Sequence, residues 1–359
     1  MHPSRSSHRT GPTALVVLGG LALTLAPGGC GFRIEPDPAF TGSGGGASQA
    51  RPIRDEATNR LFALSTSPTP QIRANAIEGL QRVGPRAEPT VALALSDENP
   101  GVRSVAAMVA GRAGLTALIP TLREMARDES GFVRASSIAA LNRLGQKADP
   151  TELSTMLLES PNPRLRAHAA FLIGEMGEQS ALPMLRQAWV TPIRTASEIE
   201  RRLVRLQVVE AMVKLGDQSS IDTLRAALYP SRPDELEATA LAVQIIGEVR
   251  DRGSIDQLIY LADDSDDRVM PAEVRLAVAG ALAKMGLTQG GFIADEYAGS
   301  PIDVVRAQAA AVYGRTGRTE HLPSLGVMLD DPSELVQVAA AAAVVDLMSG
   351  GAQADAGTP

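Results

Sequence analysis

Apolar residues recur along most of this chain with the spacing of one helix face. Counting Arg134 as position zero, the residues at −1, +4, +7 and +10 are Val133, Ile138, Leu141 and Leu144, and +3 is usually apolar in other copies. At about 100° per residue, these positions share one side of an α-helix. A glycine follows at +11 and suits the left-handed residue that closes a helix. The pattern predicts a helix that ends at this glycine.

The same unit recurs along the chain, with an aliphatic residue before the arginine and a glycine eleven residues after it. Two further stretches, at Leu236-Glu237 and Val336-Gln337, keep the aliphatic residue and the helical pattern but lose the arginine. The unit length is about 33 residues, which indicates a solenoid of stacked units that pack mainly on their neighbours. The complete copies are Arg73/Gly84, Arg103/Gly114, Arg134/Gly145, Arg166/Gly177, Arg205/Gly216, Arg275/Gly286 and Arg306/Gly317.

Each unit also contains an earlier helical segment. Residues 117–126 and 181–188 are examples, each with a proline near its beginning, where helical amides have no intrahelical partner. Aromatic residues make up only 3% of the chain, and strands would favour more of them. We therefore expect an all-α fold, with one elongated solenoid over residues 53–348.

Two strings, 99–107 and 301–311, carry a family resemblance. The units resemble HEAT repeats, close to the short form found in phycobilisome-lyase-type proteins. The resemblance implies a right-handed α-solenoid of about nine helix pairs, in which the second helices line the inner, concave wall. It also implies a ladder in which an acidic residue six positions before each arginine joins successive units. Asp97 and Asp128 hold this place, while Ser67, Ser160 and Ser300 hold it elsewhere, so some contacts would use hydroxyl or backbone groups.

The N-terminal segment resembles a bacterial lipoprotein signal peptide. Arg5 and Arg9 precede an apolar run over residues 13–26, and Cys30, the only cysteine, follows two glycines. The resemblance implies that residues 1–29 are removed and that Cys30 carries the lipid, so that the protein is exported and anchored to a membrane of the cell envelope, on the periplasmic side or the cell surface. Pro27 departs from the usual leucine at its position. An ordinary secretory signal and an uncleaved anchor are the alternatives.

The composition near the two ends differs from that of the repeats. Residues 30–52 and 349–359 are rich in small and polar residues, which predicts a flexible tether and a disordered tail. The net charge is −7 and becomes more negative without the N-terminal arginines. Nucleic-acid-binding proteins carry a basic footprint, so nucleic acid is not an expected partner.

No set of residues for catalysis, a cofactor or a metal stands out. Of four histidines, His2 and His8 would leave with the signal peptide, and His168 and His321 suit packed or solvent-facing places in a repeat. The acidic run within 263–267 lacks the alternation, glycine and final glutamate of a calcium loop, and predicts a solvated loop. We expect no enzyme activity and no cofactor. Longer spacings place insertions near 191–200 and 263–273, whose role stays open.

The helix face opposite the apolar stripe, at +2, +5 and +9, should line the concave wall. Val105, Met108 and Phe171 lie on this face, where packing does not require apolar residues, which could mark a recognition surface. Position +9 is basic in six units, either for recognition of an acidic segment or to complement the helix dipole. The face predicts a scaffold that binds another protein or peptide of the envelope. The alternatives are a bilin-lyase-like protein and a spacer without a ligand. The candidate partner-binding residues are Arg82, Val105, Met108, Arg112, Arg143, His168, Phe171, Glu210 and Lys214.

Overall fold

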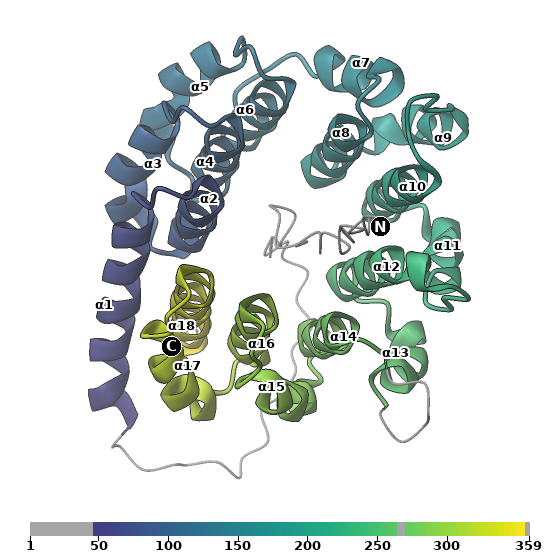
Figure 1. Cartoon of the computed structure of the whole chain (residues 1–359). Helices are drawn as coiled ribbons and strands as arrows, with labels where there is room; N and C mark the ends of the chain where they lie inside the picture. Colours follow the sequence, from purple (N-terminus) through teal and green to yellow (C-terminus); the bar gives the residue numbers. More distant parts are fainter. Residues whose placement is uncertain (1–45, 264–269, 356–359) are drawn as a thin grey trace, which may run out of the picture.

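The helix pairs form a closed ring. The computed structural model describes residues 46–263 and 270–355, and within these ranges it contains helices and connecting turns but no strand. The described residues form helices α1 to α18, which make nine pairs. Figure 1 shows the pairs following one another around the ring, with one helix of each pair outside and one inside. The predicted all-α solenoid of about nine helix pairs is confirmed, and the second helices do line the inner wall.

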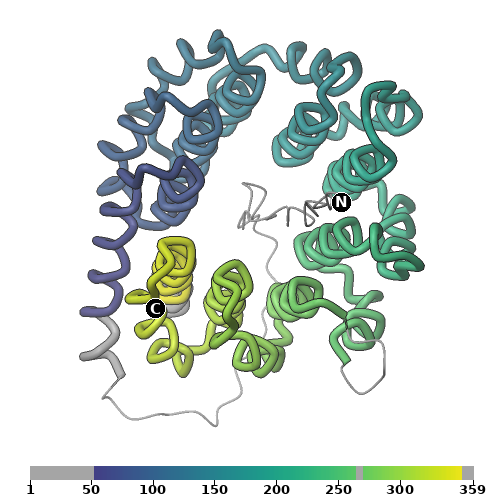
Figure 2. The backbone as a smooth tube through the Cα atoms, viewed as in Figure 1, coloured from purple at the N-terminus to yellow at the C-terminus, as the bar shows by residue number. Residues whose placement is uncertain are grey.

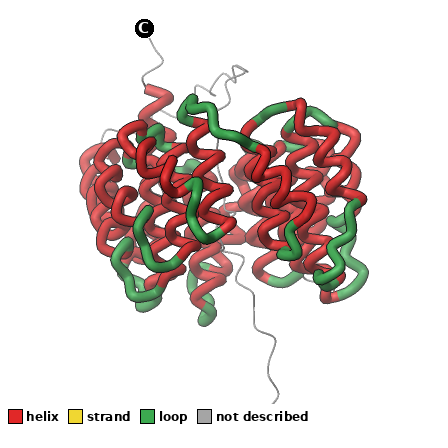
Figure 3. The backbone as a smooth tube through the Cα atoms, turned by 90° about the horizontal axis from the view of Figure 1, so that it is seen from above, coloured by secondary structure: helices red, strands yellow, loops and turns green. Residues whose placement is uncertain are grey.

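The two layers have different helix lengths. The outer helices are mostly short: α1 (Gly46–Leu64), α3 (Glu88–Ala94), α5 (Ile119–Met125), α7 (Thr151–Glu159), α9 (Leu182–Val190), α11 (Ile221–Ala226), α13 (Ile255–Ala262), α15 (Gly291–Tyr297) and α17 (Leu322–Leu329). The inner helices are α2 (Pro70–Gly79), α4 (Pro100–Arg112), α6 (Gly131–Arg143), α8 (Pro163–Met176), α10 (Glu198–Lys214), α12 (Leu236–Val249), α14 (Ala272–Lys284), α16 (Asp303–Thr316) and α18 (Glu334–Asp355). Viewed edge-on, the helices run between two rims where loops gather (Figure 3).

The helix ends follow from local residue chemistry. At the start of α4, the Asn99 side chain accepts hydrogen bonds from the amides of Gly101 and Val102, and Pro100 occupies the first turn. At the other end, all seven glycines predicted to close the second helices have positive φ angles, from 68° to 100°. Arg250 is the only other described residue with a positive φ, at 54°.

Arg250 corrects the register of one repeat. It stands where the other units have their closing glycine, so position zero of this unit is Thr239, two residues after the Glu237 that the sequence pattern indicated. The Thr239 hydroxyl donates to the carbonyl of Ala227 at 2.9 Å. The pattern selected Leu236 because it is a large aliphatic residue, whereas the residue that precedes position zero is Ala238, which is apolar but small.

An arginine ladder joins successive repeats on the predicted plan. Arg103 donates to both carboxylate oxygens of Asp128 in the next unit, at 3.0 and 2.9 Å, and to the carbonyl of Asp97 in its own unit, at 2.9 Å. Where a serine replaces the aspartate, its backbone carbonyl still accepts, as Ser300 does from Arg306 at 2.7 Å. The ladder is therefore part side chain and part backbone.

Small residues set the spacing of alternate inner helices. A Cβ on Gly111 would lie 2.8 Å from the Cα of Ala140, so α4 and α6 touch through their backbones. The same contact, between positions +8 and +6 of consecutive units, recurs at Gly174/Ala211, Gly247/Ala281 and Gly314/Ala343. From α4 to α18 it occurs at alternate junctions, with α4–α6, α8–α10, α12–α14 and α16–α18 as the close pairs, and both junctions of α2 lack it.

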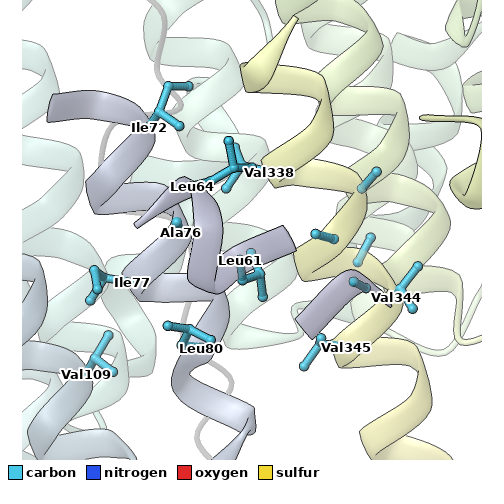
Figure 4. Close-up of a cluster of buried hydrophobic side chains, with 14 of the residues drawn as sticks. Leu61, Leu64, Ile72, Ala76, Ile77, Leu80, Val109, Val338, Val344 and Val345 are labelled. Atoms are coloured by element: carbon cyan, nitrogen blue, oxygen red, sulfur yellow. The ribbon is translucent and has the colours of Figure 1, made fainter. Parts of the chain in front are cut away.

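The expected elongated body is wrong, because the last repeat packs on the first. Leu61, Leu64 and Leu80 share one buried cluster with Val338 and Val345 (Figure 4). Polar contacts flank this cluster: Arg60 pairs with Asp330 at 2.9 Å, Arg82 pairs with Asp346 at 2.7 Å, and Ser67 donates to Glu334 at 2.8 Å. The backbone trace in Figure 2 shows the two ends of the solenoid side by side.

The helices extend beyond the predicted limits of the solenoid. α1 begins at Gly46, within the predicted tether 30–52, and α18 continues to Asp355, within the predicted tail 349–359. Alanine and glutamine among these residues favour a helix once it has been nucleated by the packed part. The predicted signal peptide and Cys30 lie outside the described residues, as do residues 264–269 of the second insertion.

The first insertion, near 191–200, is folded back onto the ring. Ile193 and Ala196 are buried, and the Thr195 hydroxyl donates to the carbonyl of Pro161. Ser197 and Glu200 form a capping box that begins α10, which is thereby longer at its start than the other inner helices of the ring's middle. Part of the insertion is therefore an extra turn of helix.

Candidate binding site on the inner wall

Charged residues form a layer where the inner helices end. The cations predicted at position +9 all belong to it, together with acids from neighbouring helices. We call this set the inner charge layer: Arg82, Arg112, Arg143, Lys214, Lys284 and Arg315, with Glu78, Glu175, Glu210, Glu248 and Asp346.

Three of the six cations of the layer, Arg82, Lys214 and Lys284, form close ion pairs. Lys214 contacts Glu175 at 2.7 Å and Glu210 at 2.6 Å, and Lys284 pairs with Glu248 of the preceding inner helix. Arg112 has a weaker ion pair. Its nearest carboxylate, Glu175, lies 3.9 Å away, two inner helices along the ring.

Burial and neighbouring charges shift the pKa values of several side chains in the inner charge layer. Burial raises the pKa of Glu78 to about 7, against the opposing attraction of Arg112. Burial, with repulsion from Arg315, lowers the pKa of Lys284 to about 8. Charge on the inner wall is thus costly, and the layer depends on pairing.

Several residues predicted to face a partner are packed instead. Met108, Phe171 and Glu210 are only 6%, 4% and 4% exposed, so the expected apolar recognition surface is wrong as an exposed surface. Phe171 lies between two cations of the layer, with Arg112 5.9 Å and Lys214 5.2 Å from its ring centroid. Neighbouring inner helices converge in a ring, so side chains at +5 reach the adjacent helix.

The remaining predicted residues keep some contact with solvent. Arg143 is exposed, and five others are half-buried: Arg82, Val105, Arg112, His168 and Lys214. None of the hydrogen bonds or ion pairs found among the described residues involves the Arg143 side chain. The sequence placed these cations and Glu210 on one wall, and the acids of the layer occupy the same two wall positions, +5 and +9. Which acid pairs with which cation depends on how neighbouring helices converge, and the repeat pattern did not predict it.

The histidines have structural roles. His168 Nε2 lies 2.9 Å from the Ser136 hydroxyl, its ring packs 5.5 Å from Phe132, and burial lowers its pKa to about 4. His321 is buried and stacks on Tyr313 with ring centroids 4.6 Å apart. Across the described parts of the chain, no three His, Cys, Asp or Glu side chains gather as metal ligands. No helix in those parts combines the length and apolar character needed to cross a bilayer.

A cavity of about 740 Å³ opens beside the layer, between α6 and α8. Arg112, Arg143 and Glu175 line it on the side of the charge layer. Its other lining residues include three methionines and several alanines and serines, notably Met108, Met176, Met184, Ala139, Ser154 and Ser180.

Comparisons with known proteins identify the repeat. A family model described as HEAT repeats matches residues 58–149 and 150–242, together over half of the chain. A comparison with curated proteins finds no match.

A comparison with solved structures gives similarities of low TM-score over most or about half of this chain. The complex of CpcE and CpcF of phycocyanin lyase from Nostoc is similar over 79% of this chain and 98% of that one, with 18% identity and a TM-score of 0.40. Human deoxyhypusine hydroxylase is similar over 84% of this chain and 98% of its own, with 17% identity and a TM-score of 0.35. A designed armadillo repeat protein covers 55% of this chain and is itself covered completely, with 16% identity and a TM-score of 0.32. Likeness of this size does not extend to an activity.

Proposed function

Because this chain belongs to the HEAT-repeat family, we propose that it is a non-enzymatic scaffold that binds another protein at the inner wall of its ring. The segment bound would contact the inner charge layer, where acidic and basic side chains are both available. Such repeats supply a framework on which recognition residues can vary.

One observation carries this proposal: the inner wall varies more from unit to unit than the framework does. The ladder arginines and closing glycines recur in most units, and position +9 on the wall is charged in each unit but not always with the same sign. Position +2 is Asn75, Val105, Ser136, His168 and Gln207 in five successive units. A wall whose residues and charges vary along the ring can position a partner in one register, which a spacer without a ligand would not need.

We also propose that the scaffold works at a membrane of the bacterial envelope, held by a lipid on Cys30. This rests on the apolar run 13–26 and the position of the sole cysteine. Labelling cells with a fatty-acid analogue should mark the wild-type chain and leave the Cys30→Ala variant unmarked. Equal labelling of both would exclude the anchor without touching the proposed binding role.

Capture from membranes tests the binding role. We would compare the wild type with Arg143→Glu, which reverses an exposed charge of the inner wall on α6 that forms no ion pair within the described ranges. The matched control, Arg127→Glu, makes the same change at an exposed residue outside the inner charge layer. We expect a specific partner to be retained by the wild type and the control and lost by the inner-wall variant. Capture that is the same for all three proteins would refute the proposal.

A further inference from the structure

The cavity between α6 and α8 exists because this junction departs from the close packing found on either side of it. Position +8 of α6 is Asn142, where α4 and α8 have glycine, and the facing position +6 of α8 is Leu172, where their partners have alanine. Both residues line the cavity. Their bulk keeps the two helices apart, and the Asn142 amide turns back to donate to the carbonyl of Ile138 at 3.0 Å.

Two guanidinium groups at this cavity lack full partners. The Arg112 side chain is only 6% exposed, and its Nη1 is buried with no hydrogen-bond partner. Arg143, a second lining residue, is exposed and takes part in no hydrogen bond or ion pair found within the described ranges. A buried donor left without a partner costs free energy, so an anion that reached Arg112 would be favoured.

The acid nearest to these arginines is already engaged. Glu175 lies 2.7 Å from Lys214 and 3.9 Å from Arg112, and Lys214 is further neutralised by Glu210. Glu178 also lines the cavity and Glu78 attracts Arg112, yet neither forms a hydrogen bond or close ion pair with Arg112 or Arg143 among the described residues. Arg112 Nη1 and Arg143 are therefore left as donors that a bound anion could use.

Away from the arginines the cavity lining combines serines and Glu178 with a flexible apolar strip. Met176, Met184 and Ala181 are half-buried and line the cavity together with the edge of Leu172. Methionine side chains are flexible and fit irregular apolar ligands. The volume lies in the range of cavities that hold small molecules, about 300 to 1,000 Å³.

We propose that this cavity binds a monocarboxylate with an unbranched apolar chain of medium length. Its carboxylate takes hydrogen bonds from Arg112 Nη1 and the Arg143 guanidinium, and its chain lies along Met176 and Met184. Charge-assisted bonds to a carboxylate are stronger than neutral ones, so the head group sets the orientation. The head group would use Arg112 and Arg143 of the inner charge layer, but the test below needs only the purified chain, so this proposal and the proposed protein partner can fail separately.

Titration with decanoate, below its micelle-forming concentration, tests the site on the purified chain. Calorimetry would measure affinity, and carbon-13 methyl labels on methionine would locate the ligand. We expect the Met176 and Met184 signals to shift, with those of Met285 and Met328 unchanged. Decan-1-ol and decyltrimethylammonium should bind at least about tenfold more weakly because they lack the carboxylate. Equal binding of the alcohol, an absence of decanoate binding, or shifts confined to the distant methionines would overturn the proposal.

Two variants separate the head-group and chain contacts. Arg143→Gln should weaken decanoate binding about tenfold or more, while Arg127→Gln, the same change at an exposed arginine outside the cavity, should not. Ala139→Leu fills the cavity from α6 and should block the chain with both arginines intact. Thermal unfolding of each variant without ligand confirms that it is folded. Unchanged affinity in Arg143→Gln or in folded Ala139→Leu would contradict the assignment.

Discussion

At the scale of single residues, the ladder arginines each satisfy two repeats at once. The Arg103 side chain and its acceptor Asp128 are both largely buried, whereas Arg134 and Glu152 keep more contact with water. The same arginine position is therefore unequally important around the ring. The loss in free energy of unfolding when the arginine is removed depends on how deeply the ion pair is buried.

Replacing Arg103 with alanine should lower the free energy of unfolding by about 2 kcal/mol, because Asp128 would keep a partly buried charge without its bidentate donor. Arg134→Ala should cost less, about 1 kcal/mol or below, since its pair is more exposed. Urea unfolding of both variants would measure the difference. A larger loss for Arg134→Ala would contradict this ranking.

Glu78 should make the ring less stable as pH rises. Its pKa is raised by burial to about 7, so between about pH 4 and pH 7 the folded state holds a proton that the unfolded state has released. Stability contributed by the protonated carboxyl is lost through this interval. Above pH 7, the free energy of unfolding of Glu78→Gln should be about 1–2 kcal/mol higher than that of the wild type. Near pH 4 the two values should match. Denaturation across pH would show a constant difference if the pKa of Glu78 were ordinary.

Arg250 occupies a left-handed conformation that seven other units give to glycine. Its φ of 54° brings its Cβ near the backbone, a conformation that costs roughly 1 kcal/mol for a residue other than glycine. Arg250→Gly should therefore raise the free energy of unfolding by about 0.5–1 kcal/mol. The reverse change, Gly286→Arg at the next unit, should lower it, and thermal unfolding would compare the two. A lower free energy of unfolding for Arg250→Gly would show that the Arg250 side chain stabilises the fold.

At the scale of elements, helices and their ends were predictable because they depend on local chemistry. The apolar stripe and the closing glycines predicted the second helices, and prolines marked the starts of α5 and α9. The predictions that were wrong concerned contacts between adjacent helices. Burial of Met108 and Phe171 follows from how closely adjacent inner helices converge, and a single helical wheel carries no information on that. The free Arg143 and the cavity beside it likewise required the junction of α6 with α8.

The close pairs of inner helices make glycine sensitive to position. Gly111→Ala would place a Cβ 2.8 Å from the Ala140 Cα, so α4 and α6 must separate, at a cost of about 1–3 kcal/mol. Gly326→Ala, in α17, meets nothing nearer than a side-chain carbon of Ile53 at 3.4 Å and should gain up to about 1 kcal/mol from helix propensity. Chemical denaturation should show the two changes with opposite signs. A stabilising Gly111→Ala would disprove the backbone contact.

At the scale of the whole molecule, closure joins the ends of the solenoid through a buried cluster. Ring closure was not predictable from the repeat, because it accumulates from small rotations between many units and each rotation depends on packing. The pairs Arg60–Asp330 and Arg82–Asp346 join residues far apart in sequence that no repeat position marks as partners.

A charge buried in the closure should open the ring. Leu61 is fully buried between the first and last repeats, so Leu61→Asp would bury a carboxylate without a partner and should cost at least about 3 kcal/mol locally. We expect small-angle scattering to give a larger radius of gyration, while circular dichroism shows that most helix remains. Leu93→Asp, at a residue 77% exposed, is the control and should change neither. An unchanged radius for a folded Leu61→Asp would mean that other contacts hold the ends together.

Closure also restricts how such a chain can change in length. An open stack tolerates the gain or loss of a unit at either end, because each unit needs only its immediate neighbours. Here the helices at the two ends bury each other's apolar faces, so one added unit would push Leu61 and Val345 apart and expose both. The gene could then lengthen only through loops on the rims or by segments outside the ring, and the number of repeats is held constant by geometry.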